Sequence, residues 1–405
     1  MSEPGPLSGI RVVELGMWAA GPACGAVLGD WGADVVKIED PRTGDPMRGF
    51  QMRRKDDPNL RVSPSFALNN RNKRSVTLNL QSPAGMTVAL DLIAKADVFV
   101  SNFRPGALER LGLDPETLTA KFSHLIYGQM TGYGHVGPER DRAAFDYGAG
   151  WARAGIMASI GEPGGPPPGQ RPAMIDHPAG LSLAGGIAAA LFERTRTGKG
   201  QIVRTSLFQM GMWMKGVDLQ AAMLGGPLPL PESRFAAVNP LFNSYRTKDG
   251  RWIYLIMMQG DRHWRDFCRA VGRHDWADDP ALQTMRDRFE RSREIVAQLD
   301  VLFAGKTFVE WIPILDAENV FWAKVQNDEE VLADPQAAAL EAWGRVADAA
   351  GVETTVLNSP IGFSRSETSL RAAAPEVGQH TEEVLLEHGY TWERIAELKE
   401  QGAIG

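Results

Sequence analysis

An aspartate that stands directly before a long apolar segment is the first candidate for chemistry. Asp176 lies between a loop rich in glycine and proline, residues 164–169, and the apolar run at residues 179–192, with Pro178 two positions further on. An aspartate at the start of a helix accepts free backbone N–H groups, so Asp176 could act as a helix cap. The same helix end stabilises a carboxylate and offers N–H groups to a developing oxyanion. The residue types alone leave both roles open.

Basic residues form a second group beside two predicted strands. Arg71, Lys73 and Arg74 come at the start of one strand, and Arg104 and Arg110 follow another. Guanidinium groups bind phosphates well, and ligands of parallel sheets bind near the carboxyl ends of the strands. These residues therefore form either a solvated charged surface or a site for a polyanion.

Several familiar catalytic signatures are absent from the sequence. The glycines of residues 16–21 do not have the spacing of a dinucleotide fingerprint, and residues 197–200 lack the rest of a P-loop. Neither HExxH nor GxSxG occurs, and Cys24 and Cys268 form no zinc pattern. We therefore predict no metal site and no Ser-His hydrolase.

The elements that must position these residues alternate in the N-terminal part of the chain. Strands are predicted at residues 9–16, 34–40, 75–80, 97–103, 124–134 and 201–208, and helices at residues 21–33, 82–96 and 179–192. Strands that alternate with helices at this spacing predict an α/β fold, in which a parallel sheet is flanked by helices.

A second, smaller α+β domain is predicted after a linker rich in proline and glycine at residues 224–235. A hairpin at residues 243–258 turns at Asp249-Gly250. The helices of this domain are predicted at residues 261–272 and 308–317. Those of the C-terminal tail are predicted at residues 328–343 and 380–389, joined through residues 352–364. The predicted boundaries are residues 1–223 for the large domain, 224–324 for the small domain with its linker, and 325–405 for a tail whose packing the pattern does not indicate.

Composition excludes several classes of function. The chain has 405 residues, of which 43% are hydrophobic and 23% charged, and its net charge is −7. The sequence contains no long basic run of the kind that favours binding to nucleic acid or to a membrane surface. The longest apolar run is too short to span a bilayer, and the first residues lack the pattern of a signal peptide. With two cysteines far apart in sequence, we expect a cytoplasmic protein without disulfides.

A set of motifs, in order along nearly the whole chain, resembles the family III CoA-transferases, the group of formyl-CoA transferase and carnitine CoA-transferase. The motifs lie at residues 7–49, 70–80, 101–113, 131–138, 171–201 and 374–389. Each is weak alone, and together they are specific.

The resemblance implies an activity and an architecture. Asp176 matches the family's catalytic nucleophile, which attacks an acyl-CoA to give a mixed anhydride and then an aspartyl-CoA thioester. CoA would pass in this way from an acyl-CoA donor to a free carboxylic acid, with no tightly bound cofactor. The tail at residues 325–405 would return to the large domain, and two copies would form an interlocked homodimer.

The resemblance also implies contacts with CoA and with the acids. The residues expected to contact CoA are Met17, Trp18, Lys37, Arg48, Lys73, Arg74, Asn102, Phe103, Arg104 and Arg110, and those expected at the substrate are Phe50, Phe145 and Asp146. Relatives carry other residues at Met17 and Trp18, so only backbone or packing contacts are expected there. Asp40 stands where formyl-CoA transferases carry an arginine that faces CoA, and that contact is not carried over.

An acyl-CoA racemase of the same fold is the main rival function. Racemisation needs an acid and a base on opposite faces of the reacting carbon. Racemases of the family place a histidine directly before an aspartate, and here Phe145 precedes Asp146. Because phenylalanine carries no proton, we favour the transferase. A non-catalytic CoA-binding protein would be expected to have lost Asp176.

Overall fold

The computed structural model describes residues 5–50, 63–226, 228, 233–348, 350–368 and 370–405. Contacts within the chain divide it into two compact units. The larger unit comprises Met1–Met157, Gly169–Pro227 and Ala338–Gly405, and the smaller unit comprises Ala158–Pro168 and Leu228–Ala337.

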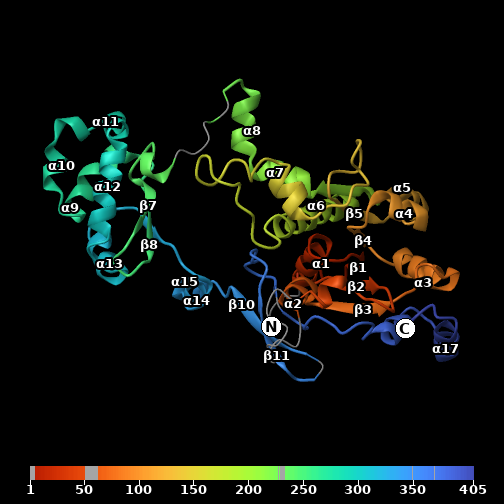
Figure 1. Ribbon diagram of the computed structural model, residues 1–405. Helices are drawn as coiled ribbons and strands as arrows, with labels where there is room; N and C mark the ends of the chain where they lie inside the picture. The colour runs from red at the N-terminus through yellow and green to blue at the C-terminus, as the bar shows by residue number, and fades with distance from the viewer. Residues whose placement is uncertain (1–4, 51–62, 227, 229–232, 349, 369) are drawn as a thin grey trace. The chain divides into compact units, whose positions relative to one another are not determined.

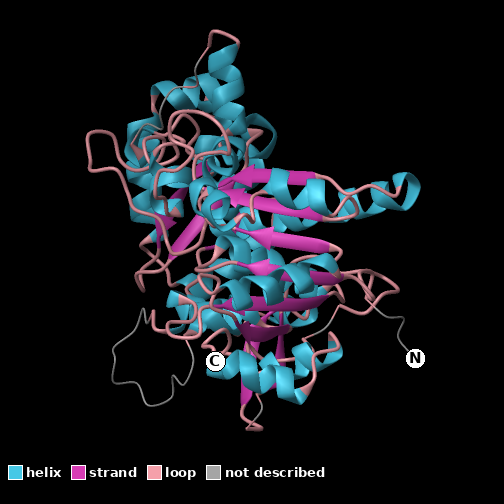
Figure 2. Ribbon diagram, turned by 90° about the vertical axis from the view of Figure 1, so that its right-hand side faces the viewer, coloured by secondary structure: helices cyan, strands magenta, loops and turns pink. Residues whose placement is uncertain are grey.

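A parallel sheet forms the centre of the larger unit (Figure 2). Its six strands lie in the order β3-β2-β1-β4-β5-β6, and every neighbouring pair is parallel. The strands are β1 (Arg11–Leu15), β2 (Asp34–Glu39), β3 (Lys73–Thr77), β4 (Val98–Ser101), β5 (Ile126–Thr131) and β6 (Ile202–Ser206). The predicted α/β fold is confirmed. The strand order reverses between β1 and β4, and in such sheets ligands bind in the crevice at this point.

Helices cover both faces of the sheet (Figure 1). They are α1 (Ala20–Asp30), α2 (Pro64–Asn70), α3 (Pro83–Ala94), α4 (Pro105–Leu111), α5 (Pro115–Lys121), α6 (Asp176–Thr197), α7 (Leu207–Met214) and α8 (Gly216–Met223), with a π-helical turn at Tyr147–Ala152. Val12 of β1 packs in one core with α1 and α6, whereas Val13 packs in the other with α3 and α4, because successive strand residues point to opposite faces. None of the helices in the described ranges is long and apolar enough to cross a membrane.

Helices α1 and α6 pack closely near their first turns. A Cβ atom added to Gly180 would lie 2.8 Å from the Cβ atom of Ala23 and 2.9 Å from the backbone N of Cys24. Only glycine therefore allows this approach. It brings the start of α6, where Asp176 stands, beside the start of α1.

The C-terminal segment packs on β3. Its helices are α16 (Thr381–Glu387) and α17 (Trp392–Glu400). The Thr77 backbone N–H donates to Oγ1 of Thr381 at 3.1 Å, and the Gly378 N–H donates to Oγ of Ser75 at 2.9 Å. Val384, Leu385 and Ile395 join the core on that face of the sheet.

The smaller unit contains an antiparallel sheet and a group of helices. Its strands are β7 (Phe242–Arg246), β8 (Trp252–Ile256) and β9 (Trp322–Lys324), and its helices are α9 (Gly260–Ala270), α10 (His274–Asp278), α11 (Met285–Glu290), α12 (Ser292–Phe303), α13 (Phe308–Asp316), α14 (Asp328–Leu332) and α15 (Pro335–Ala339). The predicted hairpin is confirmed by the antiparallel pairing of β7 with β8. The smaller unit has an aromatic core, in which the rings of Trp264 and Trp276 stack with their centroids 5.7 Å apart.

The observed units differ from the predicted boundaries. The smaller unit continues past residue 324 to Ala337, because the Val325 N–H donates to the carbonyl of Trp252 at 3.2 Å and Arg251 pairs with Glu330. Residues 158–168 also belong to it.

Two predictions for the tail are wrong. The helix expected at residues 328–343 is broken into α14 and α15, since the residue before Pro335 is disfavoured in helical conformation. Trp343, expected as the last residue of that helix, and residues 353–357, expected as part of a connection, lie in the antiparallel pair β10 (Trp343–Ala347) and β11 (Glu353–Leu357).

Candidate active site

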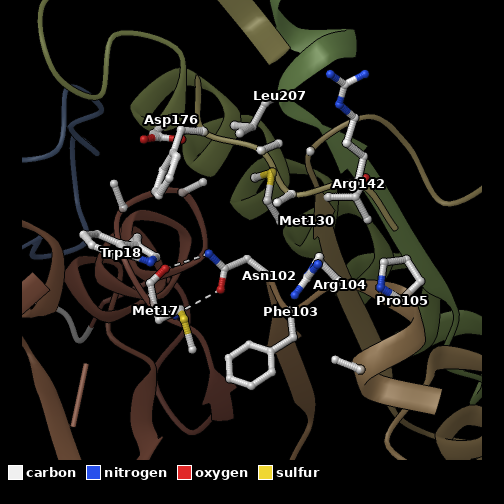
Figure 3. A pocket seen from close by; sticks show the side chains of 18 of the residues that line it. Met17, Trp18, Asn102, Phe103, Arg104, Pro105, Met130, Arg142, Asp176 and Leu207 are labelled. Carbon is white, nitrogen blue, oxygen red and sulfur yellow. Dashed lines mark hydrogen bonds between the residues drawn. The ribbon is translucent and has the colours of Figure 1, made fainter. Parts of the chain in front are cut away.

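The candidate site lies where β1 and β4 end side by side. Met17 follows β1, and Asn102 follows β4. The Met17 N–H donates to Oδ1 of Asn102 at 3.0 Å, and Nδ2 of Asn102 donates to the Met17 carbonyl at 2.7 Å. Figure 3 shows both bonds as dashed lines. This two-way pairing fixes the two strand ends to each other.

A cavity of about 400 Å³ opens beside this pair. Seven of the residues predicted for the site line it, namely Met17, Trp18, Asn102, Phe103, Arg104, Phe145 and Asp176. The structure thus brings the predicted nucleophile and much of the predicted CoA site to one place, although they come from four distant parts of the sequence.

Trp18 has an unusual backbone conformation. Its φ is +64°, in the left-handed region that favours glycine. The Trp18 N–H donates to Oδ1 of Asp45 at 3.0 Å, and the same oxygen accepts from the Met47 N–H at 2.9 Å. Backbone in this region costs free energy and persists where surrounding groups hold it. Asp45 is one such group.

A buried ionic network holds the loop that carries Trp18. Nζ of Lys37 lies 3.1 Å from Glu14 and 2.9 Å from Asp45, Nζ of Lys73 lies 2.8 Å from Glu14, and all these side chains have no exposed surface. Lys37 also donates to the carbonyl of Gly16 at 2.7 Å, and Lys73 to that of Pro22 at 2.8 Å. The network therefore binds the backbone on both sides of Trp18, at Gly16 and at Pro22.

The two lysines differ in their electrostatic surroundings. Burial lowers the pKa of Lys73 to about 8, although Glu14 works against this effect. Burial also works to lower the pKa of Lys37, but Glu14, Asp45 and Glu39 outweigh it and hold this pKa above its usual value. Lys37 is the better compensated cation because more carboxylates surround it.

Four residues predicted to contact CoA are paired with acids of the chain itself. Lys37 and Lys73 are enclosed in the network above, so they offer no surface to a ligand. Arg48 binds Glu39 through two nitrogens at 2.9 and 2.6 Å and the Pro375 carbonyl at 2.8 Å. Arg74 pairs with Asp34 at 2.6 Å and with Glu387 at 2.7 Å. Their charges neutralise carboxylates of the chain itself, and contact of these four residues with CoA stays a prediction.

Arg104 and Arg110 remain available as candidates for anion binding. Both line a second cavity, together with Gly106, Glu109 and Asp141. Arg104 also lines the cavity of Asp176. A ligand with phosphates at one end could therefore extend past Arg104 toward Asp176.

Asp176 does not cap the helix that it begins. Ile175 is the N-cap residue of α6, and no side chain caps that position. Instead, Oδ2 of Asp146 accepts the Ile175 N–H at 3.3 Å. Asp146 is only 2% exposed and holds the start of α6 through this bond, and its contact with substrate stays a prediction.

The carboxyl group of Asp176 is hard to ionise in the free site. Burial raises its pKa to about 8, and the negative charge of Asp146 adds to this effect. The same environment makes the ionised form a stronger base and nucleophile, because burial and the charge of Asp146 destabilise that form.

Three aromatic rings form a cluster, and two of them, Trp18 and Phe145, line the cavity together with Asp176. The Trp18 ring packs edge to face on Phe50, with centroids 5.7 Å apart, and on Phe145, with centroids 5.4 Å apart. Phe50 is 42% exposed and Phe145 58% exposed. The predicted substrate residues Phe50 and Phe145 therefore form an open apolar wall with Trp18 between them.

Comparison with known proteins identifies the family. The model of CoA-transferase family III matches residues 7–381. The chain belongs to CoA-transferase family III. The prediction of a CoA-transferase is thereby confirmed at the level of the family.

Relatives of this family III chain match it over almost its full length. It is 36% identical to the (R)-2-hydroxy-4-methylpentanoate CoA-transferase of Clostridioides difficile, over 98% of this chain and 99% of the relative. It is 34% identical to the cinnamoyl-CoA:phenyllactate CoA-transferase of Clostridium sporogenes, over 97% of this chain and 95% of the relative. The crystal structure of a CaiB/BaiF family protein from Brucella suis is similar, with a TM-score of 0.84, 29% identity, and coverage of 95% of this chain and 100% of that one.

Sequence reasoning missed two acids of this family III site. Glu14 and Asp45 form the buried ionic network, yet neither was predicted as functional. Glu14 carried a usable signal, because an acid inside the apolar strand RVVEL must be paired when it is buried. Asp45 carried none, since its partners Trp18 and Lys37 are distant in sequence.

Proposed function

We propose that this chain transfers CoA from an acyl-CoA donor to a free carboxylic acid, with Asp176 as the covalent nucleophile. The observation that carries the proposal is the position of the Asp176 carboxyl group. It lines the cavity at the first residue of α6 and is not used as the cap of that helix. A carboxylate in such a place is free to react.

The first half of the reaction moves CoA onto the protein. An oxygen of the ionised Asp176 attacks the thioester carbonyl, the C–S bond breaks, and CoA leaves as a thiolate while a mixed anhydride forms. The thiolate then attacks the Asp176 carboxyl carbon. The donor acid leaves as a carboxylate, and Asp176 is left as a CoA thioester. The Asp176 carboxyl group stays activated throughout, first as the anhydride and then as the thioester.

The second half of the reaction repeats these steps in reverse. The acceptor carboxylate attacks the Asp176 thioester, releases the thiolate and forms a second anhydride. The thiolate then attacks the acceptor's carbonyl carbon and regenerates the Asp176 carboxylate. No proton is gained or lost overall. Water would hydrolyse either intermediate, so the apolar wall of Trp18 and Phe145 serves to limit its access.

CoA would bind along the strand ends that hold the cavity. Arg104 and Arg110 would meet its phosphates, because both line the outer cavity and Arg104 lines the inner one as well. The backbone at Met17 and Trp18, with the side chains of Asn102 and Phe103, would contact the arm that carries the sulfur. The thioester would then lie between these residues and Asp176.

Heavy oxygen tests this route directly. The enzyme is incubated with an acyl-CoA and an acceptor acid labelled in both carboxylate oxygens, and the peptide that holds Asp176 is analysed by mass spectrometry. The route leaves one acceptor oxygen on Asp176 in each turnover, so the peptide becomes heavier. Transfer of CoA without label in this peptide would contradict a covalent Asp176 intermediate.

We also propose the interlocked homodimer as the working form. Apolar residues on α7 and α8 support it, since Trp213 is 81%, Val217 79% and Met223 77% exposed in the single chain. Patches of this kind mark interaction surfaces. Light scattering should give about twice the chain mass of 44.2 kDa, and an active particle at the mass of one chain would contradict the dimer.

A further inference from the structure

The wall of the cavity near Asp176 is apolar. Trp18, Phe145, Met130 and Leu207 line the cavity together with small residues such as Ala20. Figure 3 places Asp176 on the side of Trp18 and Leu207, and Arg104 and Arg142 on the opposite side of Met130. An acyl group bound at Asp176 would therefore lie against rings, methyl groups and a thioether.

In the described part of the chain, Arg104 and Arg142 stand across Met130 from Asp176 (Figure 3). Among the described residues that line the cavity, the cations are Arg104, Arg140 and Arg142. Arg140 is paired with Glu109 and Asp141, and Arg142 lies 2.9 Å from Glu139. Arg104 also lines the second cavity, together with Arg110.

Negative charge, by contrast, lies close to the reacting group. Asp146 is buried and bonded to the residue before Asp176, and its charge acts on the Asp176 carboxyl group. A second carboxylate on a substrate would be repelled there. It would also lose its water against an apolar wall without gaining an ion pair, which is costly.

We propose that the site selects acids whose acyl group is apolar and carries no second charge, and that Trp18 and Phe145 are the residues that select it. This inference rests on the proposed function, because it takes Asp176 as the point of acyl attachment. Dicarboxylic acids are then poor substrates, while aliphatic and aromatic monocarboxylic acids of similar length are good ones.

Arg171 is the cation outside the cavity that could pair with a second carboxylate of a substrate, so its contribution is tested with a control variant. It is exposed and does not line the cavity in the described structure. Burial, Asp146 and Asp176 raise the pKa of the Tyr147 phenol while Arg171 lowers it, so Arg171 and Asp176 act on one phenol. A dicarboxylate that reached Arg171 would find a partner there.

The test measures exchange of a labelled acid into its own CoA thioester, so that donor and acceptor are the same. Three acids are compared: hexanoate, monomethyl adipate and adipate. Monomethyl adipate matches adipate in backbone but lacks the second charge. We expect exchange of hexanoate and of monomethyl adipate, with kcat/KM for adipate lower by at least about a hundredfold. Similar values for adipate and its monomethyl ester would overturn the inference.

Variants assign the selectivity to residues. Phe145→Lys places a cation on the wall, and because Phe145 is 58% exposed the fold should tolerate it. We expect the ratio of adipate to monomethyl adipate exchange to rise at least about tenfold, while the uncharged control Phe145→Met leaves it low. Arg171→Ala should not change the ratio. An unchanged ratio in Phe145→Lys, or a ratio that falls in Arg171→Ala, would show that other residues select the acid.

The outcomes separate this inference from the proposed function. Succinyl-CoA with labelled succinate is run beside the three acids. Exchange of succinate or adipate without exchange of hexanoate would leave CoA transfer intact and overturn the apolar selectivity. Absence of exchange with all four acids would contradict the proposed function itself.

Discussion

The carboxylate of Asp45 accepts the backbone N–H of Trp18 at 3.0 Å and holds that residue at a φ of +64°. Its other oxygen lies 2.9 Å from the ammonium group of Lys37. One buried acid therefore joins the ionic network of Glu14, Lys37 and Lys73 to the aromatic ring at the cavity. The site depends in this way on charges that a ligand never touches.

Asp45→Asn separates the hydrogen bond of this residue to the Trp18 N–H from its ion pair with Lys37. The amide keeps an oxygen for the Trp18 N–H but removes the charge paired with Lys37. Because a buried ion is left undercompensated, we expect the free energy of unfolding to fall by about 3 kcal/mol. Asp40→Asn is the matched control, since Asp40 pairs with the exposed Arg42 at 3.3 Å, and should cost less than about 1 kcal/mol. Urea unfolding measures both, and equal losses would contradict this assignment.

Stability should depend on pH through Asp176. Its pKa is raised from 3.8 to about 8 in the folded chain, so between these values the folded state holds a proton that the unfolded state has released. The free energy of unfolding therefore falls as pH rises through this window. Asp176→Asn has no such titration. Its stability relative to the native chain should grow with pH, by at most about 1.4 kcal/mol per pH unit. A difference that stays constant from about pH 5 to 8 would contradict the raised pKa.

The rate of transfer should rise with pH for the same reason. Only the ionised Asp176 attacks, so kcat/KM should increase with pH until this group is deprotonated in the free enzyme. Asp146→Asn removes the neighbouring negative charge but keeps an oxygen for the Ile175 N–H. We expect the rising limb of its pH profile to move to lower pH. A profile that does not move would show that Asp146 does not act on Asp176.

The strands of the larger unit could be predicted because they are buried on both faces. Such strands read as short apolar runs, and β1, β2, β4 and β5 all do. β10 and β11 were missed because only one residue of each strand is buried, and their sequences WGRVA and ETTVL contain few core residues. Where burial is slight, the pattern of apolar residues carries little information.

The sequence predicted which residues gather at the candidate site better than it predicted what each of them does there. Asp176 was found from its place before an apolar helix, but the helix begins with Ile175 as its cap. The N–H of Ile175 is accepted by Asp146, 29 positions earlier. Lys73 and Arg74 stand next to each other in sequence, yet one is enclosed with Glu14 and the other pairs with Asp34 at the surface. These roles follow from packing between distant segments, which local spacing does not encode.

The central claim is that Asp176 is a nucleophile, and the transfer rate of Asp176→Asn tests it most directly. Asparagine has nearly the size of aspartate but cannot form the anhydride. With hexanoyl-CoA and labelled hexanoate, we expect exchange to fall by at least about 10³-fold, while circular dichroism and the affinity for CoA remain those of the native chain. Hydroxylamine should also trap a hydroxamate at this position in the native enzyme and none in the variant. Near-native exchange by Asp176→Asn, with reversion to aspartate excluded by mass, would contradict the account.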